Sequence, residues 1–186
     1  MVSYRPEWPQ EFVVIGSRLR RSMGELALRI DHIGSTSVPG LAAKDVIDVQ
    51  ITVQELSGAV QMALEDAGYA RREGIWTDHV PPGQPASSDE WSKWMFKPVG
   101  AQRPANLHVR IAGRRNQRYP LLFRDYIRAH SPVAKAYAQV KQALAHDHPD
   151  DMDAYYAVKD PVCDIIMGAA EDWAVGIHWQ PGPSDC

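Results

Sequence analysis

Residues 32–50 read HIGSTSVPGLAAKDVIDVQ and join a small-residue turn to a strand. The turn, residues 34–37, leaves backbone N–H groups and hydroxyls available to an anion. After it, residues 46–53 alternate strictly between apolar and polar side chains, which predicts a strand with one buried face. Asp48 and Gln50 then lie on the polar face just past the turn. A turn that can cradle an anion, beside a carboxylate that can hold Mg²⁺, suits a nucleoside triphosphate.

A second alternating segment spans residues 105–111, with His108 and Arg110 among its polar positions. If both strands bury their apolar sides against the same helices, their polar sides share the opposite face. Asp48 and Gln50 then look toward the same space as His108 and Arg110. We therefore predict a site where these strands meet.

The rest of the chain predicts helices and further strands around this pair. Apolar residues recur at helical spacing over about residues 9–26, 56–67, 117–128, 131–144 and 151–173. Strands are expected over residues 27–33, 69–76 and 91–97. This order of elements predicts a mixed α/β (α+β) fold with a helical C-terminal layer.

Local signals mark several ends and connections. Thr52 and Glu55 fit a capping box, and Ser131 fits an N-cap. Residues 78–89, which include Gly83, Ser87 and Ser88, form a proline-rich segment that we interpret as a surface loop, with a lid over the site as the alternative. Residues 1–175 are expected to form one domain, and the Pro/Gly-rich residues 176–186 a flexible tail.

Composition limits the class of protein. The chain has 186 residues, 45% hydrophobic and 23% charged, enough for one globular domain with a sizeable core. Its formal net charge of -3 argues against a general nucleic-acid binder, which is normally basic. No apolar run is long enough to cross a membrane and the N-terminus lacks a signal-peptide pattern, so a cytoplasmic location is expected. The positions of Cys163 and Cys186 suggest neither a structural disulfide nor a zinc site.

Several motifs together resemble the GrpB family, within the wider nucleotidyltransferase fold. They are Trp8-Pro9, residues 32–50, Leu107-His108-Val109, residues 123–128, Ala136-Tyr137, Lys141 and Lys159. The resemblance implies a glycine-serine turn followed by a strand with two acids one position apart. Asp48 matches the first acid. Gln50 stands where the second acid is expected, which puts a firmly held metal and nucleotidyl transfer in question.

Each candidate residue has a functional and a structural interpretation. We assign Mg²⁺ coordination to Asp48, with a solvated strand position as its alternative. Gln50 is a weaker, uncharged candidate ligand. His108 is a candidate metal ligand, general base or hydrogen-bond donor to the substrate, although a lone histidine in a strand is more often structural.

The remaining candidates would bind phosphate or an acidic substrate. Gly34, Ser35, Thr36 and Ser37 are expected to contact the phosphates, unless the turn only satisfies its own backbone. Basic residues complete the set: Lys44, Arg103, Arg110, Arg124, Lys141 and Lys159. Each of these has ordinary surface pairing or solvation as its alternative.

The leading hypothesis is an Mg²⁺-dependent enzyme that uses a nucleoside triphosphate, such as ATP. It would transfer a nucleotidyl or phosphoryl group to a small-molecule acceptor, or activate the carboxylate of such a molecule. The alternative is a nucleotide- or phosphate-binding module with a regulatory role and no catalysis, which Gln50 favours. The sequence lacks the glycine-lysine-serine end of a Walker motif.

Overall fold

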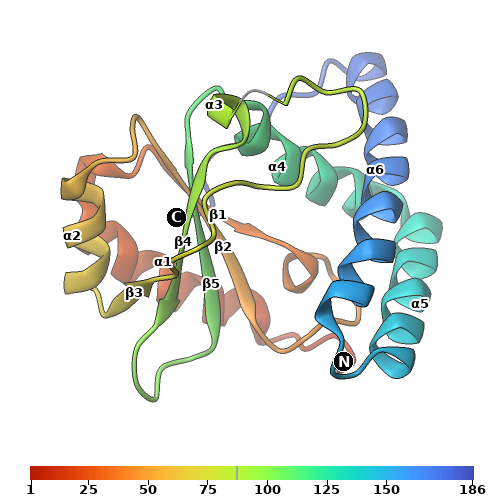
Figure 1. Ribbon diagram of the computed structural model, residues 1–186, viewed down its shortest axis with the longest axis horizontal. Helices are drawn as coiled ribbons and strands as arrows, with labels where there is room; N and C mark the ends of the chain where they lie inside the picture. The colour runs from red at the N-terminus through yellow and green to blue at the C-terminus, as the bar shows by residue number, and fades with distance from the viewer. Residues whose placement is uncertain (87) are drawn as a thin grey trace.

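A five-stranded mixed sheet lies between helices α1 and α2 on one side and helices α4, α5 and α6 on the other (Figure 1). The computed structural model describes residues 1–86 and 88–186. Along the chain the elements are α1 (Trp8–Met23), η1 (Gly24–Leu26), β1 (Arg29–Ile33), η2 (Ser35–Ser37), β2 (Ile47–Val53), α2 (Gly58–Asp66), β3 (Tyr69–Arg71), α3 (Ser88–Trp91), β4 (Lys93–Pro98), β5 (Ala105–Ile111), α4 (Arg115–Ala129), α5 (Ser131–Asp147) and α6 (Met152–Gly176). This confirms the predicted α+β fold with a helical C-terminal layer.

The strand order is β1-β2-β5-β4-β3, so the two alternating strands β2 and β5 are neighbours in the centre. They run parallel, and the other neighbouring strands pair antiparallel. The β2–β5 register places Asp48 beside Asn106 and Gln50 beside His108. The polar side chains of both strands therefore share one face.

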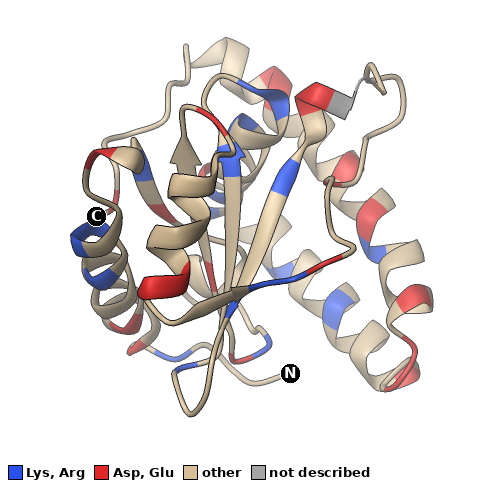
Figure 2. Cartoon of the chain, turned by 60° about the vertical axis from the view of Figure 1, so that its left-hand side comes forward, with Lys and Arg blue, Asp and Glu red and all other residues tan. Residues whose placement is uncertain are grey.

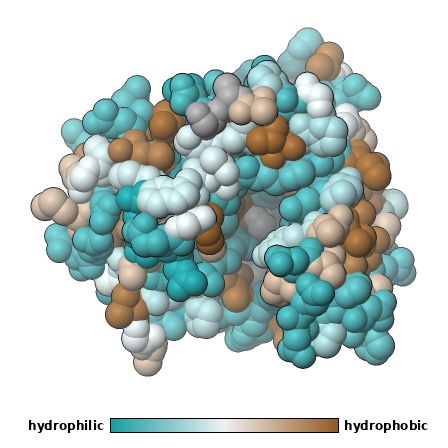
Figure 3. Space-filling view, in the orientation of Figure 1, coloured by the Kyte–Doolittle hydropathy of each residue, from teal (hydrophilic) through white to brown (hydrophobic). Residues whose placement is uncertain are grey.

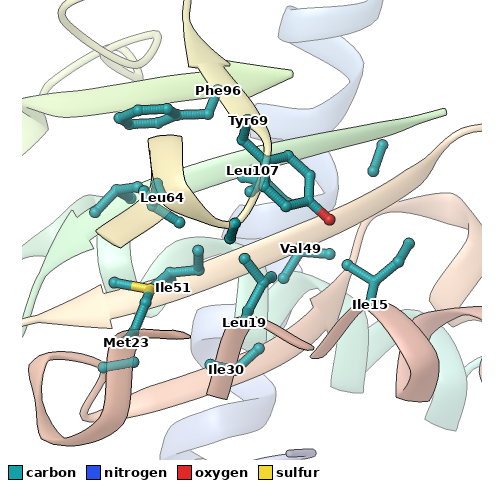
Figure 4. Packing of buried hydrophobic residues seen from close by; sticks show 14 of the residues in the cluster. Ile15, Leu19, Met23, Ile30, Val49, Ile51, Leu64, Tyr69, Phe96 and Leu107 are labelled. Carbon is teal, nitrogen blue, oxygen red and sulfur yellow. The ribbon is translucent and has the colours of Figure 1, made fainter. Parts of the chain in front are cut away.

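The apolar face of the sheet forms the main core with α1 and α2 (Figure 4). Leu19 of α1 and Leu64 of α2 are fully buried against Val49 and Ile51 of β2 and Leu107 of β5. The alternation of β2 and the helical spacing of α1 thus meet in one hydrophobic cluster, as period-two and period-3.6 patterns require.

A second apolar cluster holds the C-terminal helices together. It joins α4, α5 and α6 to Val38 and Leu41, the residues that follow the glycine-serine turn. The turn is thereby anchored to the helical layer. No helix in the described part of the chain combines the length and apolarity needed to cross a membrane.

Some element ends differ from the sequence predictions. Residue 52 lies within β2, so Thr52 cannot cap α2, which begins after Ser57. Ser131 is the first residue of α5, and His130 occupies the N-cap position. The strand expected over 69–76 ends at Arg71. Strand pairing and packing set these ends, because caps and propensities are weak local signals.

The C-terminal segment differs from the expected flexible tail, because its last residues lie along the outer edge of β1. The Cys186 N–H donates to the Ile30 carbonyl at 3.1 Å. The Ser184 hydroxyl accepts from the Ile30 N–H and donates to the Ile30 carbonyl. The Asp185 carboxylate accepts from the His32 N–H at 2.8 Å. Edge pairing of this kind satisfies the free backbone groups of β1.

The proline-rich loop crosses toward the helical layer. Ser87 lies outside the described residues, and Ser88 begins α3. Within the described part, Asp78 N–H donates to the Trp91 carbonyl at 2.9 Å, which closes the base of the loop. His79 Nε2 lies 2.8 Å from the Asp164 carboxylate of α6. The loop therefore joins the sheet side to the last helix.

Candidate functional site

A cavity of about 660 Å³ opens between the polar face of the sheet and the C-terminal helices. It is visible as a hollow in the middle of the surface (Figure 3). The turn, β2, β4, β5 and all three C-terminal helices contribute to its wall. The basic residues that line it are Lys44, Arg72, Lys93, Lys97, Arg110, Arg124, Lys141 and Lys159. Figure 2 shows basic positions on the strands and on the C-terminal helices.

Asp48 projects from β2 into this cavity. Its Oδ1 accepts a hydrogen bond of 2.8 Å from the Asn106 side chain, and His108 Nε2 lies 3.8 Å from the same oxygen. Burial alone would raise the pKa of Asp48, but the neighbouring His108 and Asn106 hold that pKa below its ordinary value. The residue is therefore a carboxylate at neutral pH, with its second oxygen turned to the glycine-serine turn.

Gly34 lies directly against that carboxylate. Its backbone is left-handed, with φ of 67°, a conformation that favours glycine. A Cβ at this position would lie 2.9 Å from Cβ and Cγ of Asp48 and closer still to Oδ2. The absent side chain thus lets the turn approach the carboxylate.

The hydroxyl groups of the turn are already partly engaged. Ser35 Oγ accepts a hydrogen bond of 2.7 Å from Lys141 Nζ of α5. Thr36 Oγ1 lies 3.0 Å from His32 Nε2, and Ser37 Oγ donates to the Gly34 carbonyl at 2.6 Å. The first of these residues faces a cation at the cavity wall, whereas Ser37 lies outside the lining of the cavity.

Arg128, the last residue of the motif at 123–128, holds the turn from α4. Its guanidinium donates to the Ser37 carbonyl at 2.7 and 3.0 Å. The turn is therefore fixed from α4 as well as from α5.

Gln50 is not available as a metal ligand. Its side chain is fully buried: Nε2 donates to the Gln117 carbonyl of α4 at 2.9 Å, and Oε1 accepts from Arg110 Nη1 at 2.8 Å. The structure thus gives both polar ends of this side chain internal partners, whereas the sequence predicted that it faces the site. The reason is that α4 covers the centre of β2, so a polar residue there must find internal partners.

Arg110 is likewise committed to an internal partner. Its Nε and Nη2 donate to the Asp78 carboxylate at 2.8 and 2.9 Å, and Lys93 Nζ approaches the same carboxylate at 2.6 Å. Burial acts to raise the pKa of Asp78, yet the charges of Arg110 and Lys93 prevail and lower it. Asp78 was missed from the sequence because it lies in a loop without any motif.

Arg103 and Arg124 also hold the fold together. Arg103 lies away from the cavity, where it bonds Glu11 at 2.8 Å and both the backbone and the carboxylate of Asp45. Arg124 reaches the cavity wall, but it bonds the His32 carbonyl at 3.0 Å and the carboxylates of Asp125 and Asp185. Arg103 is therefore not brought to the predicted phosphate site, and Arg124 is occupied by internal acceptors.

Lys141 is a buried cation at the cavity wall. Besides Ser35, its Nζ donates to the Ala42 carbonyl at 2.9 Å. Burial, aided by the charge of Lys159, lowers the pKa of Lys141 to about 8. The residue thus carries a positive charge at neutral pH without an acidic partner among the described residues.

Lys44 and Lys159 complete the basic side of the cavity. Lys44 Nζ lies 4.7 Å from the centre of the Tyr155 ring and 3.4 Å from Met152 Sδ. In the described chain no carboxylate pairs with it. Lys159 Nζ, in contrast, lies 3.3 Å from the Asp160 carboxylate.

His108 faces Asp48 through one ring nitrogen and leaves the other unused. Its Nδ1 is buried and has no hydrogen-bond partner in the described structure. Burial lowers the pKa of His108, and Asp48 only partly offsets this effect. The ring is therefore neutral at pH 7. With Nε2 directed at the carboxylate, Nδ1 is left as a hydrogen-bond acceptor.

Comparison with known proteins identifies a family with this architecture. The model of the family described as "GrpB protein" matches residues 1–168. The chain belongs to the GrpB family. The crystal structure of conserved protein GrpB from Enterococcus faecalis superposes with a TM-score of 0.71 at 29% identity, and the match covers 92% of this chain and 98% of that one.

Relatives by sequence are longer than this chain. UPF0157 protein YqkA of Bacillus subtilis is 32% identical, and the match covers 100% of this chain and 51% of that protein. A protein of Mycolicibacterium paratuberculosis named dephospho-CoA kinase is 38% identical, over 95% of this chain and 47% of the relative. The chain thus spans about half the length of these relatives.

A more distant solved structure shows the wider fold. Cid1, described as having RNA terminal uridylyl transferase activity, matches with a TM-score of 0.50 at 14% identity, over 78% of this chain and 42% of Cid1. This GrpB family member therefore has a nucleotidyltransferase-like fold.

Proposed function

We propose that this GrpB protein binds a nucleoside triphosphate in the cavity and transfers its nucleotidyl or phosphoryl group to a small acceptor. The observation that carries the proposal is the balance of charge around Asp48. Lys44 and Lys141 line the same cavity as this carboxylate, and neither has an acidic partner among the described residues. A ligand that brings several negative charges would satisfy them.

The metal that fits this site is one that arrives with the nucleotide. Within the described residues, no group of three or more His, Cys, Asp or Glu side chains is arranged to hold a metal ion. Mg²⁺ commonly keeps several waters and binds through one or two carboxylates together with substrate phosphates. Asp48 alone is consistent with that mode, in which the metal neutralises phosphate charge.

Other residues of the chain would bind the remaining parts of the nucleotide and support the site. Lys141 and Ser35 would contact phosphate oxygens beside Gly34, and Lys44 would add a mobile positive charge. Tyr156, which lines the cavity and is 48% exposed, offers a ring on which a base can stack. His108, whose Nε2 lies 3.8 Å from Asp48 Oδ1, would hold this carboxylate in place beside the nucleotide.

A nucleotide-binding module without catalysis is the second candidate. It is favoured by Gln50, which stands where a second acid is expected and whose side chain is fully occupied by Gln117 and Arg110. A site with one carboxylate can bind a metal–nucleotide complex more easily than it can activate an attacking hydroxyl.

The kinase activity in the name of the mycobacterial relative does not enter the proposal. The chain spans about half of that protein and contains no G-x-x-x-x-G-K-[ST] loop, the motif that cradles phosphates in Walker-type proteins.

The test is Asp48→Asn, a change that keeps the shape of the side chain and removes its charge. We expect Mg²⁺-dependent ATP binding, measured by titration calorimetry, to weaken by roughly tenfold or more, because the metal loses the carboxylate assigned to it. Binding without Mg²⁺ should be retained, since a negative charge is removed. Asp147→Asn, at an exposed position of α5, is the matched control.

The outcomes separate the candidates. Equal ATP affinity with and without Mg²⁺ in the unmodified protein would contradict the metal role of Asp48. Mg²⁺-dependent binding without any nucleotide product, across a panel of hydroxyl, amine and carboxylate acceptors, would favour the binding module over the transferase.

A further inference from the structure

A second group of cations lines the opposite wall of the cavity, away from the glycine-serine turn. Arg72, just after β3, and Lys97 of β4 are both exposed and both line the cavity. Neither side chain has a hydrogen-bond or ion-pair partner among the described residues. They differ in this from Arg110 and Lys93, which both form ion pairs with the Asp78 carboxylate.

The sheet register relates these cations to Asp48. Met95 of β4 pairs with His108, and Lys97 lies two residues farther along β4, toward the end of β5 that carries Asn106. Asn106 in turn pairs with Asp48 of β2. Asp48 and Lys97 therefore lie two strand spacings apart, about 10 Å, on one face of the sheet.

Arg72 extends the same cationic wall. Its N–H donates to the Met95 carbonyl at 2.8 Å, which fixes its backbone beside β4. The preceding Arg71 turns to the other face, where its guanidinium stacks 3.9 Å from the Trp94 ring centre. Alternation along the strand then directs Arg72 to the cavity face.

Asp48 thus lies between two sets of unpaired cations. Lys44 and Lys141 belong to the side of the turn, and Arg72 and Lys97 to the side of β4. One triphosphate beside the turn would leave the second set without an anion. His108, which pairs with Met95, belongs to β5, the strand between Asp48 and Lys97.

We propose that Arg72 and Lys97 form the acceptor subsite, and that the acceptor is a small molecule with a terminal carboxylate or phosphate and a hydroxyl or amine group. This inference rests on the proposed function. Arg72 would bind the oxyanion through paired N–H donors and Lys97 as a point charge. The hydroxyl or amine would extend along the same face of the sheet toward the nucleotide phosphates at Asp48.

The transfer step exchanges one bond to phosphorus for another. The acceptor oxygen or nitrogen forms a bond to phosphorus as the bond from phosphorus to the leaving phosphate or pyrophosphate breaks. The proton of the acceptor is released to solvent water in the cavity.

The experiment compares Arg72→Gln/Lys97→Gln with the matched control Arg21→Gln/Lys135→Gln, which removes the same charge from exposed positions of α1 and α5. The probes are glycerol 3-phosphate and glycerate, with glycerol as their neutral counterpart. Each is titrated by calorimetry into the full chain, with and without saturating Mg²⁺ and a non-hydrolysable ATP analogue.

We expect the oxyanion probes to bind the unmodified protein and the control, and glycerol to bind at least roughly tenfold more weakly. The double variant should lose at least roughly tenfold in affinity for the oxyanions while its affinity for the ATP analogue changes less than about twofold. That split assigns Arg72 and Lys97 to the acceptor.

Several results would overturn the subsite. In the unmodified protein, they are glycerol binding as tightly as the oxyanions, or failure of both oxyanions to bind at millimolar concentration. In the double variant, they are unchanged oxyanion binding, or a loss of ATP-analogue affinity that matches the loss of oxyanion affinity. If the unmodified protein fails to bind the ATP analogue but the oxyanions still depend on Arg72 and Lys97, the proposed function fails and the anion subsite stands.

Discussion

At the scale of single residues, the contact between Gly34 and Asp48 decides how close the turn comes to the carboxylate. The glycine has φ of 67° and no room for a Cβ on its Asp48 side. Gly40, farther along the same stretch, has φ of 77° but nothing within 4 Å of an added Cβ. Both glycines have a left-handed backbone, but only a Cβ at Gly34 would clash with another side chain.

Gly34→Ala should therefore displace the Asp48 carboxylate, whereas Gly40→Ala should not. Both changes carry the left-handed backbone cost of about 1–2 kcal/mol, visible in urea unfolding. Only Gly34→Ala is expected to weaken Mg²⁺-dependent ATP binding, by roughly tenfold. Similar ATP affinity in the two variants would show that the close approach of the turn is not needed for binding.

At the scale of elements, α5 controls the turn through one buried cation. Lys141 reaches from α5 to Ser35 and to the Ala42 carbonyl, so the helix, the turn and the segment before β2 share one ammonium group. Its pKa of about 8 means that this group loses its charge just above neutral pH.

ATP affinity should consequently fall as the pH rises through about 8, because only the protonated form of Lys141 attracts phosphate. Bound phosphate favours the charged form, so the fall moves to higher pH in the complex. Lys141→Met should bind weakly throughout, without this dependence, and Lys44→Met should bind weakly but retain it. Calorimetry from about pH 7 to about pH 9 measures all three proteins. A fall that persists in Lys141→Met would assign it to another group.

At the scale of the whole molecule, Asp78 connects parts that are distant in sequence. Its carboxylate accepts from Arg110 of β5, Lys93 of β4 and, at 3.0 Å, the Asn116 side chain of α4. Sheet, loop and helical layer thus meet at one partly buried acid in the wall of the cavity. Removing one member of such a network leaves the others unpaired.

Asp78→Asn should destabilise the protein by about 3–5 kcal/mol in urea unfolding at neutral pH, since it leaves the buried Arg110 and the partly buried Lys93 without a counter-charge. The comparison is Glu171→Gln, which breaks the exposed pair with Arg118 and should cost less than about 1 kcal/mol. Equal effects of the two changes would mean that the Asp78 cluster is well solvated and contributes little to stability.

The sequence alone was sufficient for the strands that carry the site. The alternation of residues 46–53 and 105–111 identified β2 and β5 within one residue, because a period of two is a local property of the chain. The same reasoning placed Asp48 and His108 on one face, and the motif resemblance identified the family. Element ends were less accurate, since pairing partners and packing set them.

Only the tertiary structure decided which polar and charged side chains are free to bind a ligand. Gln50 and Arg110 carry the same sequence pattern as Asp48 and His108, yet their side chains are occupied by Gln117 and Asp78. These partners lie 67 and 32 residues away, so neither local periodicity nor spacing could show the pairing. Local patterns determine how a residue is oriented, whereas its availability to a ligand depends on what the rest of the fold brings beside it.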